Sequence, residues 1–244
     1  MASTPDTSLG PDGGARRDAA RIRLGILCLL ASGVFSAIGL PLRGPIVLPG
    51  EDPQRWAEVA LLPTHDLAWA ILLPSLVIQL FGFLALWAYV RDTREDALAF
   101  WGMVLSIAGN GLFLPSTGIL AFSDPRVAPL VQAGVPGALE VATSGVSGAL
   151  SGAILAGSGL LLLAGSVLVS LVLWRSPRLP RWTAVPYLLH ALALTIVAPQ
   201  SYLLERAGGV LLLVVAGAIT LRVWRGTAAA PAGRAGGATA GSAR

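Results

Sequence analysis

The chain has 244 residues, of which 55% are hydrophobic and only 12% are charged, and its mean hydropathy is +0.73. Soluble domains carry about 25% charged residues, so this composition excludes an ordinary soluble protein and indicates a chain embedded in lipid. All the cationic side chains are arginine, and the net charge is +4. These arginines flank apolar segments, as expected of side chains that hold helix ends at lipid headgroups, so we expect a lipid bilayer and no nucleic acid as partner.

The two ends of the chain lack any apolar periodicity. Residues 1–20 are rich in Ala, Gly, Asp, Ser and Pro, and residues 226–244 form a second low-complexity segment. Such segments bury too little apolar surface to offset the entropy lost on ordering. We therefore expect two disordered cytoplasmic tails on either side of a transmembrane domain at 21–225.

Six apolar runs, separated by short clusters of charged residues, follow one another between the tails. They are Leu24–Leu42, Leu67–Val90, Ala97–Phe122, Val146–Trp174, Thr183–Ala198 and Ala207–Trp224. The first run exceeds the apolar core of about 7–15 residues found in signal peptides, so we expect it to be retained as a membrane helix. The sequence therefore predicts an all-α fold, a polytopic bundle of six transmembrane helices.

The distribution of arginine predicts the orientation, because positive residues near helix ends are retained on the cytoplasmic side. With six crossings and an inner N-terminus, the outer loops contain only Arg43, Arg55, Arg126 and Arg206. The remaining arginines then all lie inside. We expect both termini in the cytoplasm. The abundance of arginine, alanine and glycine without lysine is typical of a GC-rich bacterium, which indicates a bacterial cytoplasmic membrane.

Both long outer loops contain an Asp-Pro pair, which favours the start of a helix because the carboxylate can cap it and proline fits its first turn. Asp52 and Pro53 precede Trp56, and Asp124 and Pro125 precede a second apolar segment. We expect short amphipathic helices at 53–62 and 125–133, lying over the outer end of the bundle.

Polar residues near the middle of the membrane are the candidate binding residues. Gln79, Asn110 and His190 lie near the midplane, where unpaired polar groups are costly, so they should face the interior. Ser116 and Thr117 flank Pro115, which should break the third helix. We expect His190 to be neutral, with Gln79 or Asn110 as its hydrogen-bond partner in a polar core. A transport role for His190 and the broken helix is the alternative.

Small residues on two helices suggest close helix packing within the membrane. One stripe comprises Gly25, Cys28, Ser32, Ser36 and Gly39, and the other comprises Gly148, Gly152, Ala156, Gly159, Ser166 and Ser170. We interpret both as contacts that hold the bundle together rather than as a dimer face. Cys28 is the only cysteine, which excludes an internal disulfide.

Catalytic patterns are weak throughout the chain. Gly145–Gly148 reads GxSG, as in rhomboid proteases, but His190 belongs to another helix and depth, and the other rhomboid motifs are missing. The two histidines differ too much in depth to share a haem, and the apolar runs contain no carboxylate for metal or proton chemistry. We expect neither metal nor cofactor.

Three segments carry a resemblance to known sequences: LWRSPRLPRW at 173–182, GNGLFLPSTGILAF at 109–122 and DPQRWAEVA at 52–60. Together they resemble small six-helix integral membrane proteins of actinobacteria and related bacteria, whose function is unknown. The resemblance implies the same six-helix body but no site. We expect a non-enzymatic protein that binds a small apolar or lipid-like ligand, or a membrane partner; a small solute transporter and a membrane enzyme of another type are the alternatives.

Overall fold

The computed structural model describes residues 11–198 and 200–228, and this part of the chain is helical without strands, which confirms the predicted all-α class. The elements in chain order are α1 (Pro11–Arg43), α2 (Pro53–Ala60), α3 (His65–Val90), α4 (Asp96–Gly118), the π-helical η1 (Ile119–Ser123), α5 (Asp124–Gln132), α6 (Ala138–Ser147), α7 (Ala149–Arg175), the 3-10 turn η2 (Arg181–Thr183), α8 (Ala184–Leu192), the π-helical η3 (Ala193–Val197) and α9 (Tyr202–Ala228). Residues 11–20 are therefore helical, in contrast to the disordered tail expected there, and residues 1–10 and 229–244 lie outside the described residues.

Five helical segments within the described part are long and apolar enough to cross a membrane. They are Arg17–Arg43, His65–Val90, Asp96–Gln132, Ala138–Arg175 and Tyr202–Thr227. The fifth predicted run forms α8, with 9 residues, followed by the 5 residues of η3. At about 1.5 Å per residue this piece spans roughly 20 Å, less than the roughly 30 Å of a bilayer core. The count of six crossings therefore stays a prediction.

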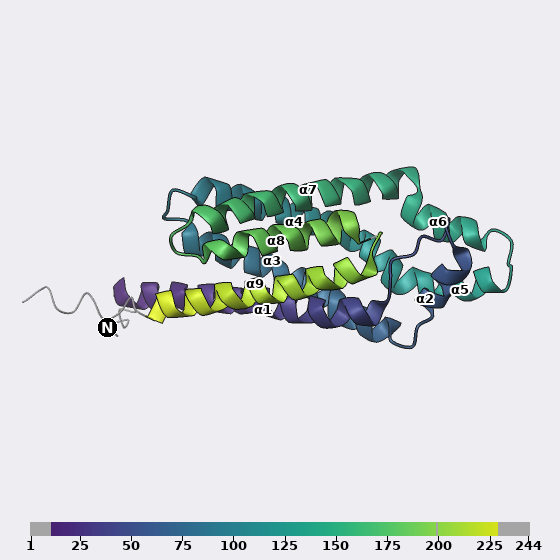
Figure 1. Cartoon of the computed structure of the whole chain (residues 1–244), viewed down its shortest axis with the longest axis horizontal. Helices are drawn as coiled ribbons and strands as arrows, with labels where there is room; N and C mark the ends of the chain where they lie inside the picture. Colours follow the sequence, from purple (N-terminus) through teal and green to yellow (C-terminus); the bar gives the residue numbers. More distant parts are fainter. Residues whose placement is uncertain (1–10, 199, 229–244) are drawn as a thin grey trace, which may run out of the picture.

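The long helices lie side by side along the longest axis of the molecule (Figure 1). Helix α1 packs most extensively against α3 and α9, α4 packs against α7, and α8 fills the space between α7 and α9. The short helices α2, α5 and α6 gather beyond one end of this bundle. We call residues 44–64 and 124–148 the cap, and the bundle end beside them the cap end.

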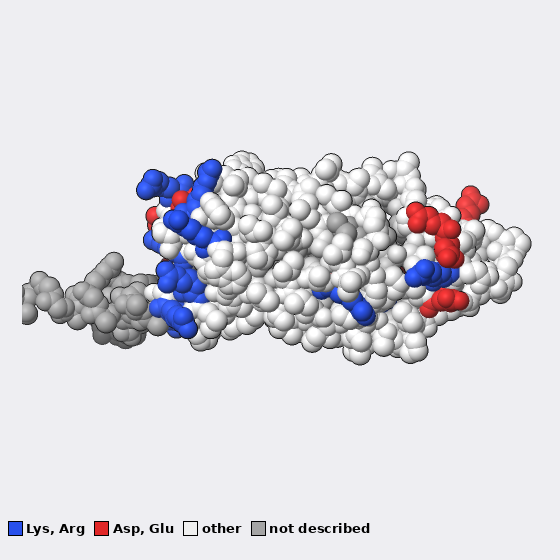
Figure 2. All heavy atoms as spheres, viewed as in Figure 1, with Lys and Arg blue, Asp and Glu red and all other residues white. Residues whose placement is uncertain are grey.

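Charged side chains gather at the two ends of the molecule, and the face shown between them is white except for one patch of arginine on the side toward the cap (Figure 2). Arginines dominate the end opposite the cap, which we call the arginine end. Its described arginines include Arg91, Arg94, Arg175, Arg178, Arg181, Arg222 and Arg225. This band of few charges is the surface expected of a bundle that faces lipid tails.

The largest apolar cluster fills the half of the bundle near the arginine end, where Val90, Leu173 and Val223 are almost fully buried. The half near the cap holds a smaller cluster of Leu40, Trp69, Leu72 and Ala121. Buried polar side chains occur in both halves, and His65 and Glu205 lie in the half with the smaller apolar cluster.

The first small-residue stripe packs as predicted. A Cβ at Gly25 would overlap Ala85, and one at Gly39 would lie 2.6 Å from Leu72. Helices α1 and α3 thus approach too closely for larger residues at these positions.

The second stripe packs along only part of its length. Ser166 and Ser170 are buried, and a Cβ at Gly165 would lie 2.8 Å from the Ser106 backbone nitrogen. At Gly159, by contrast, no neighbouring atom lies within 4 Å of the Cβ position. The interpretation of this stripe as an internal contact is therefore correct for the arginine-end half and wrong for the cap-end half of α7.

Both predicted loop helices form, but only the first starts as predicted. The Asp52 carboxylate accepts a hydrogen bond of 3.0 Å from the Arg55 N–H and so caps α2. Asp124 caps nothing, because α4, η1 and α5 form one continuous helical segment from Asp96 to Gln132. The predicted break at Pro115 is replaced by the π-helical turn η1 that begins four residues later.

Candidate functional site: buried polar residues at the cap end of the bundle

An ion pair joins the cap-end termini of α1 and α9. Arg43 Nη2 donates to both oxygens of Glu205, at 2.6 Å and 2.7 Å. The Glu205 side chain is only 2% exposed and that of Arg43 only 12%. Such a buried pair has lost its hydration, so removing one partner would leave an uncompensated charge. The position of Glu205 in the first turn of α9 adds stabilisation from the helix dipole.

The aromatic pair His65 and Trp69 lies beside this ion pair, one helical turn apart on α3. The Arg43 guanidinium carbon is 6.0 Å from the Trp69 ring centre, and the His65 and Trp69 rings meet edge to face with centroids 6.3 Å apart. The two side chains are 6% and 5% exposed, yet both His65 ring nitrogens and Trp69 Nε1 lack a hydrogen-bond partner among the described residues. Each unsatisfied buried group costs about 1–3 kcal/mol, which makes this a candidate binding position.

Tyr202 and Arg206 lie one helical turn apart on α9, on either side of Glu205 in the sequence. The Arg206 guanidinium stacks 4.1 Å from the Tyr202 ring centre, and the Tyr202 hydroxyl donates to the Pro41 carbonyl at 2.7 Å. Arg206 Nε is buried and also lacks a partner among the described residues. We call Arg43, His65, Trp69 and Glu205 the polar cluster.

Apolar side chains from both π-helical turns line the polar cluster. Trp69 packs with Leu40, Leu72 and Ala121, and Leu120 of η1 and Leu194 of η3 pack against that group. Because π-helical turns are rare and frequently occur at functional sites, their convergence here supports a site at this position.

The midplane residues predicted from the sequence do not make the expected contacts with one another. His190 is buried, and its Nδ1 lies 2.8 Å from the Gly208 carbonyl of α9. Asn110 donates to the Ser106 carbonyl of its own helix at 3.0 Å. The hydrogen bond expected between His190 and Asn110 or Gln79 is therefore not formed among the described residues. Helix α8 packs on α7 and α9, whereas Gln79 lies on α3 and Asn110 on α4.

Among the described residues, no hydrogen bond joins Thr117 or Ser116 to His190. The buried Thr117 hydroxyl donates to the Leu114 carbonyl at 2.8 Å, and Ser116 is half-buried on α4. Hydroxyls that bond within their own helix need no other partner. A role of these residues in ligand binding stays a prediction.

Sequence reasoning missed Glu205, because the predicted run began two residues later at Ala207. One sequence signal was available. Glu205 precedes the last apolar run and Arg43 follows the first, and six alternating crossings would bring both residues to the same end of the bundle. The spacing of His65 and Trp69 at i and i+4 also placed them on one helix face, but no sequence signal shows that their nitrogens lack partners.

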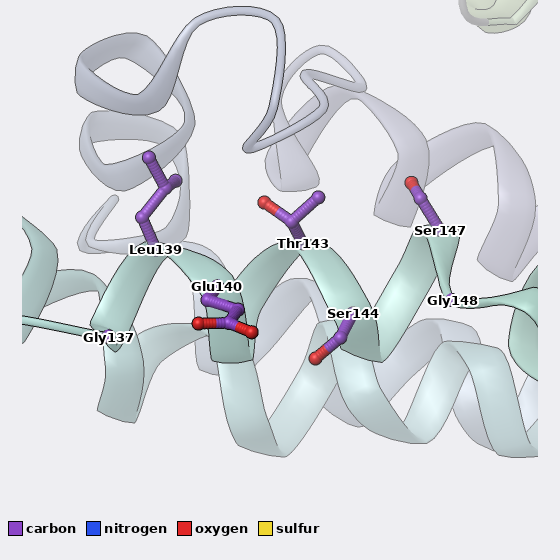
Figure 3. A pocket seen from close by; sticks show the side chains of 7 residues that line it. All are labelled: Gly137, Leu139, Glu140, Thr143, Ser144, Ser147 and Gly148. Atoms are coloured by element: carbon purple, nitrogen blue, oxygen red, sulfur yellow. The ribbon is translucent and has the colours of Figure 1, made fainter.

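A hollow of about 500 Å³ lies on the cap along α6. Its lining residues are Gly137, Leu139, Glu140, Thr143, Ser144, Ser147 and Gly148 (Figure 3). Leu139, Thr143 and Ser147 point to one side of the helix, and Glu140 and Ser144 to another. One segment lines the whole hollow, so it is an open face that cannot enclose a ligand. Neither histidine lines it, so Ser147 of the GxSG segment has no histidine base there.

Asp124 is a second buried carboxyl and lies in the cap. The continuous segment Asp96–Gln132 has 37 residues, and at about 1.5 Å per residue it measures roughly 55 Å, so Asp124 lies beyond the roughly 30 Å that span lipid. Burial raises the pKa of Asp124 to about 6, although a hydrogen bond of 3.2 Å from Trp56 Nε1 opposes the shift. Trp56 belongs to α2, so this bond links the two halves of the cap.

Within the described residues, no group of three or more His, Cys, Asp or Glu side chains could hold a metal ion. A scan against protein-family models found no match, and searches of curated proteins and of solved structures found no similar chain. The assignment of function therefore rests on the geometry of this chain.

Proposed function

We propose that the chain is a six-crossing integral protein of a bacterial cytoplasmic membrane, with both termini in the cytoplasm, that binds a small lipid-like molecule at its polar cluster. The observation that carries this proposal is the pair of buried side chains, His65 and Trp69, whose nitrogens lack partners inside an apolar surrounding. The proposed binding is non-enzymatic and needs no cofactor.

The path of the chain supports six crossings. Arg181 precedes α8 at the arginine end, and Tyr202 begins α9 at the cap end, so α8 and η3 connect the two ends despite their short length. The α9 termini make the corresponding contacts: Tyr202 bonds to Pro41 at one end, and the Arg23 side chain donates to Thr227 at 2.7 Å at the other. Retention of positive charge inside then assigns the arginine end to the cytoplasm.

Single-cysteine labelling in a Cys28→Ser background tests this topology. Cysteines replacing Arg55 and Arg126 in the cap should react with an impermeant thiol reagent in intact cells. Cysteines replacing Thr93 and Arg178 should react only after the cells are opened. Reaction at position 178 from outside would contradict the six-crossing arrangement.

A small amphipathic ligand suits the polar cluster because the site combines hydrogen-bond donors with apolar neighbours. Binding sites for small molecules commonly have an apolar lining with a few polar groups that fix orientation. Trp69 Nε1 is a donor only, and each His65 ring nitrogen can take part in one hydrogen bond. A polar head could pair with these groups while its chain lies against Leu40, Leu72 and Leu120.

Native mass spectrometry of the protein purified from its own membrane tests the binding. We expect the spectrum to contain an adduct of lipid-like mass that organic extraction removes. The double substitution His65→Phe with Trp69→Phe should abolish the adduct, whereas Trp182→Phe at the arginine end should retain it. A wild-type protein that never carries an adduct would contradict the proposal.

A transport function is the second candidate, and the convergence of η1 and η3 on Trp69 favours it, because π-helical turns inside helices frequently occur at functional sites. Reconstituted vesicles loaded with the identified ligand would distinguish the two functions. A transporter should release the ligand across the bilayer, and with a proton-linked mechanism His190→Gln should abolish the pH dependence of release. A binding protein should show saturable uptake without release.

A further inference from the structure

The arginine end carries a surface made by the loop between α7 and α8 and by the last turns of α9 (Figure 2). We infer that this surface binds the headgroup of an anionic phospholipid. We call Arg178, Arg181, Arg222 and Arg225 the basic patch. It lies at the opposite end of the bundle from the polar cluster, so the inference goes beyond the function proposed above and does not depend on it.

Hydrogen bonds and burial fix the loop between α7 and α8 against two other helices. Arg222 of α9 donates from Nε to the Arg178 carbonyl at 3.3 Å. Arg178 Nη1 in turn donates to the Tyr89 carbonyl at the end of α3 at 3.0 Å. The loop is anchored beneath these contacts by Ser176 and Leu179, which are both buried. The Arg178 and Arg222 side chains are therefore held at the junction of the loop with α9.

Arg181 and Arg225 complete the basic patch. Arg181 begins η2, which packs against α9, and Arg225 lies three residues after Arg222, on the same side of that helix. Both residues are exposed. The four arginines therefore lie around the contact between the loop and α9, and two of them are open to a partner.

The basic patch has no carboxylate partner within the described part of the chain. One of the two salt bridges found there lies within α1, and the other joins Arg43 to Glu205 at the cap end. The side chains of Arg181 and Arg225 also donate no hydrogen bond to a described residue, unlike those of the other two patch arginines. Like charges gathered on one surface repel one another, so they favour an anionic partner that accepts their hydrogen bonds.

Exposed apolar side chains begin directly beside the basic patch. Val185 and Leu189 follow Arg181 at intervals of four residues and are exposed on α8. Leu221, one turn before Arg225 on α9, is exposed as well. In a bundle embedded in lipid these side chains face the acyl chains, so the arginines next to them lie at the level of the headgroups.

Tryptophans at both ends of the loop segment indicate the same level. Trp174 and Trp182 are exposed, and indole rings are enriched among headgroups because they combine an apolar body with an N–H donor. A phosphate could thus contact the basic patch while its acyl chains lie along α8 and α9. This continuity of cationic and apolar surface favours a phospholipid over a soluble polyanion such as nucleic acid.

Native mass spectrometry with two phospholipids of identical acyl chains tests the inference. Delipidated wild-type protein in detergent would be titrated with dioleoyl phosphatidylglycerol and with dioleoyl phosphatidylcholine. Both lipids carry a phosphate, but the choline ammonium neutralises it. One arginine near an anionic surface strengthens binding about fivefold, so contact with Arg181 and Arg225 predicts that phosphatidylglycerol binds about 25-fold more tightly.

Arg181→Gln with Arg225→Gln is the informative double variant, because neither side chain bonds to a described residue. It should bind both lipids equally, and unchanged binding of phosphatidylcholine would show that it is folded. The control Arg17→Gln with Arg94→Gln removes the same charge from exposed sites on α1 and beside α4, and should keep the preference. An equal loss in both double variants would assign the preference to the general charge of this end and overturn the inference.

Three further results would also overturn it. The first is equal affinity of wild type for the two lipids. The second is full displacement of phosphatidylglycerol by an equimolar amount of glycerophosphoglycerol, because a soluble anion would then suffice. The third is loss of the preference in His65→Phe with Trp69→Phe, which would place the lipid at the polar cluster. Unchanged binding in that variant supports the basic patch even if the polar cluster itself holds no ligand.

Discussion

Replacing Asp124 by asparagine should remove most of the pH dependence of the cap's stability. Burial raises the pKa of Asp124 from 3.8 to about 6, so the folded cap binds the proton more tightly than the unfolded segment does. The stability of the folded cap is therefore greatest below about pH 4 and falls as the pH rises through about 6. At 1.36 kcal/mol per unit of pKa, ionisation of Asp124 costs the cap about 3 kcal/mol by pH 7.

Other charged groups of the cap do not compensate this ionisation. The Arg126 guanidinium on α5 donates to the Phe122 carbonyl, and Glu58 and Glu140 are exposed on α2 and α6. No salt bridge joins Asp124 to a described arginine. Trp56 Nε1 is its side-chain partner, and one neutral donor cannot replace the hydration of a carboxylate.

Hydrogen exchange of α2 and α5, corrected for the intrinsic effect of pH on exchange, measures this stability locally. Protection of 53–60 in the wild type should fall by about 100-fold between pH 4 and pH 7, which corresponds to the same free energy. Asp124→Asn should keep high protection throughout, and the exposed-site control Glu58→Gln should behave as wild type. An unchanged pH profile in Asp124→Asn would refute the assignment of the effect to Asp124.

Two further substitutions test the packing of the bundle. Gly165→Ala should lower the unfolding temperature, because the new Cβ would meet the Ser106 backbone and such overpacking costs about 1–3 kcal/mol. The control Gly157→Ala should leave the unfolding temperature unchanged, because no neighbouring atom lies within 4 Å of a Cβ at position 157. His190→Leu should lower the free energy of unfolding by about 1 kcal/mol, because it removes the hydrogen bond to the Gly208 carbonyl. Chemical denaturation in detergent measures this loss. An unaltered stability would mean that the bond contributes nothing to the contact between α8 and α9.

The composition and local signals of the sequence predicted most of the helical architecture. Long apolar runs predict helices because each run must satisfy its own backbone hydrogen bonds in lipid. The Asp52–Pro53 pair predicted α2 correctly, because capping depends only on neighbouring residues. The stripe from Gly25 to Gly39 predicted the close contact of α1 with α3, because small residues permit such an approach.

The buried carboxyls could not be predicted in the same way, because their surroundings come from distant parts of the chain. Asp124 has the local signature of a helix cap, yet Trp56 covers it and α4 continues through it. The partner of His190 is a backbone carbonyl, which no residue type reveals. Local patterns therefore predicted the elements, whereas the site depends on which helices become neighbours.

The continuous segment from Asp96 to Gln132 gives the cap a mechanical connection to the interior of the bundle. Its π-helical turn contributes Ala121 and Leu120 to the surroundings of Trp69, and its far end carries Asp124 and the contact with α2. The same helical segment thus holds both the titratable carboxyl of the cap and two neighbours of the Trp69 indole, so a displacement of Asp124 would also move Leu120 and Ala121.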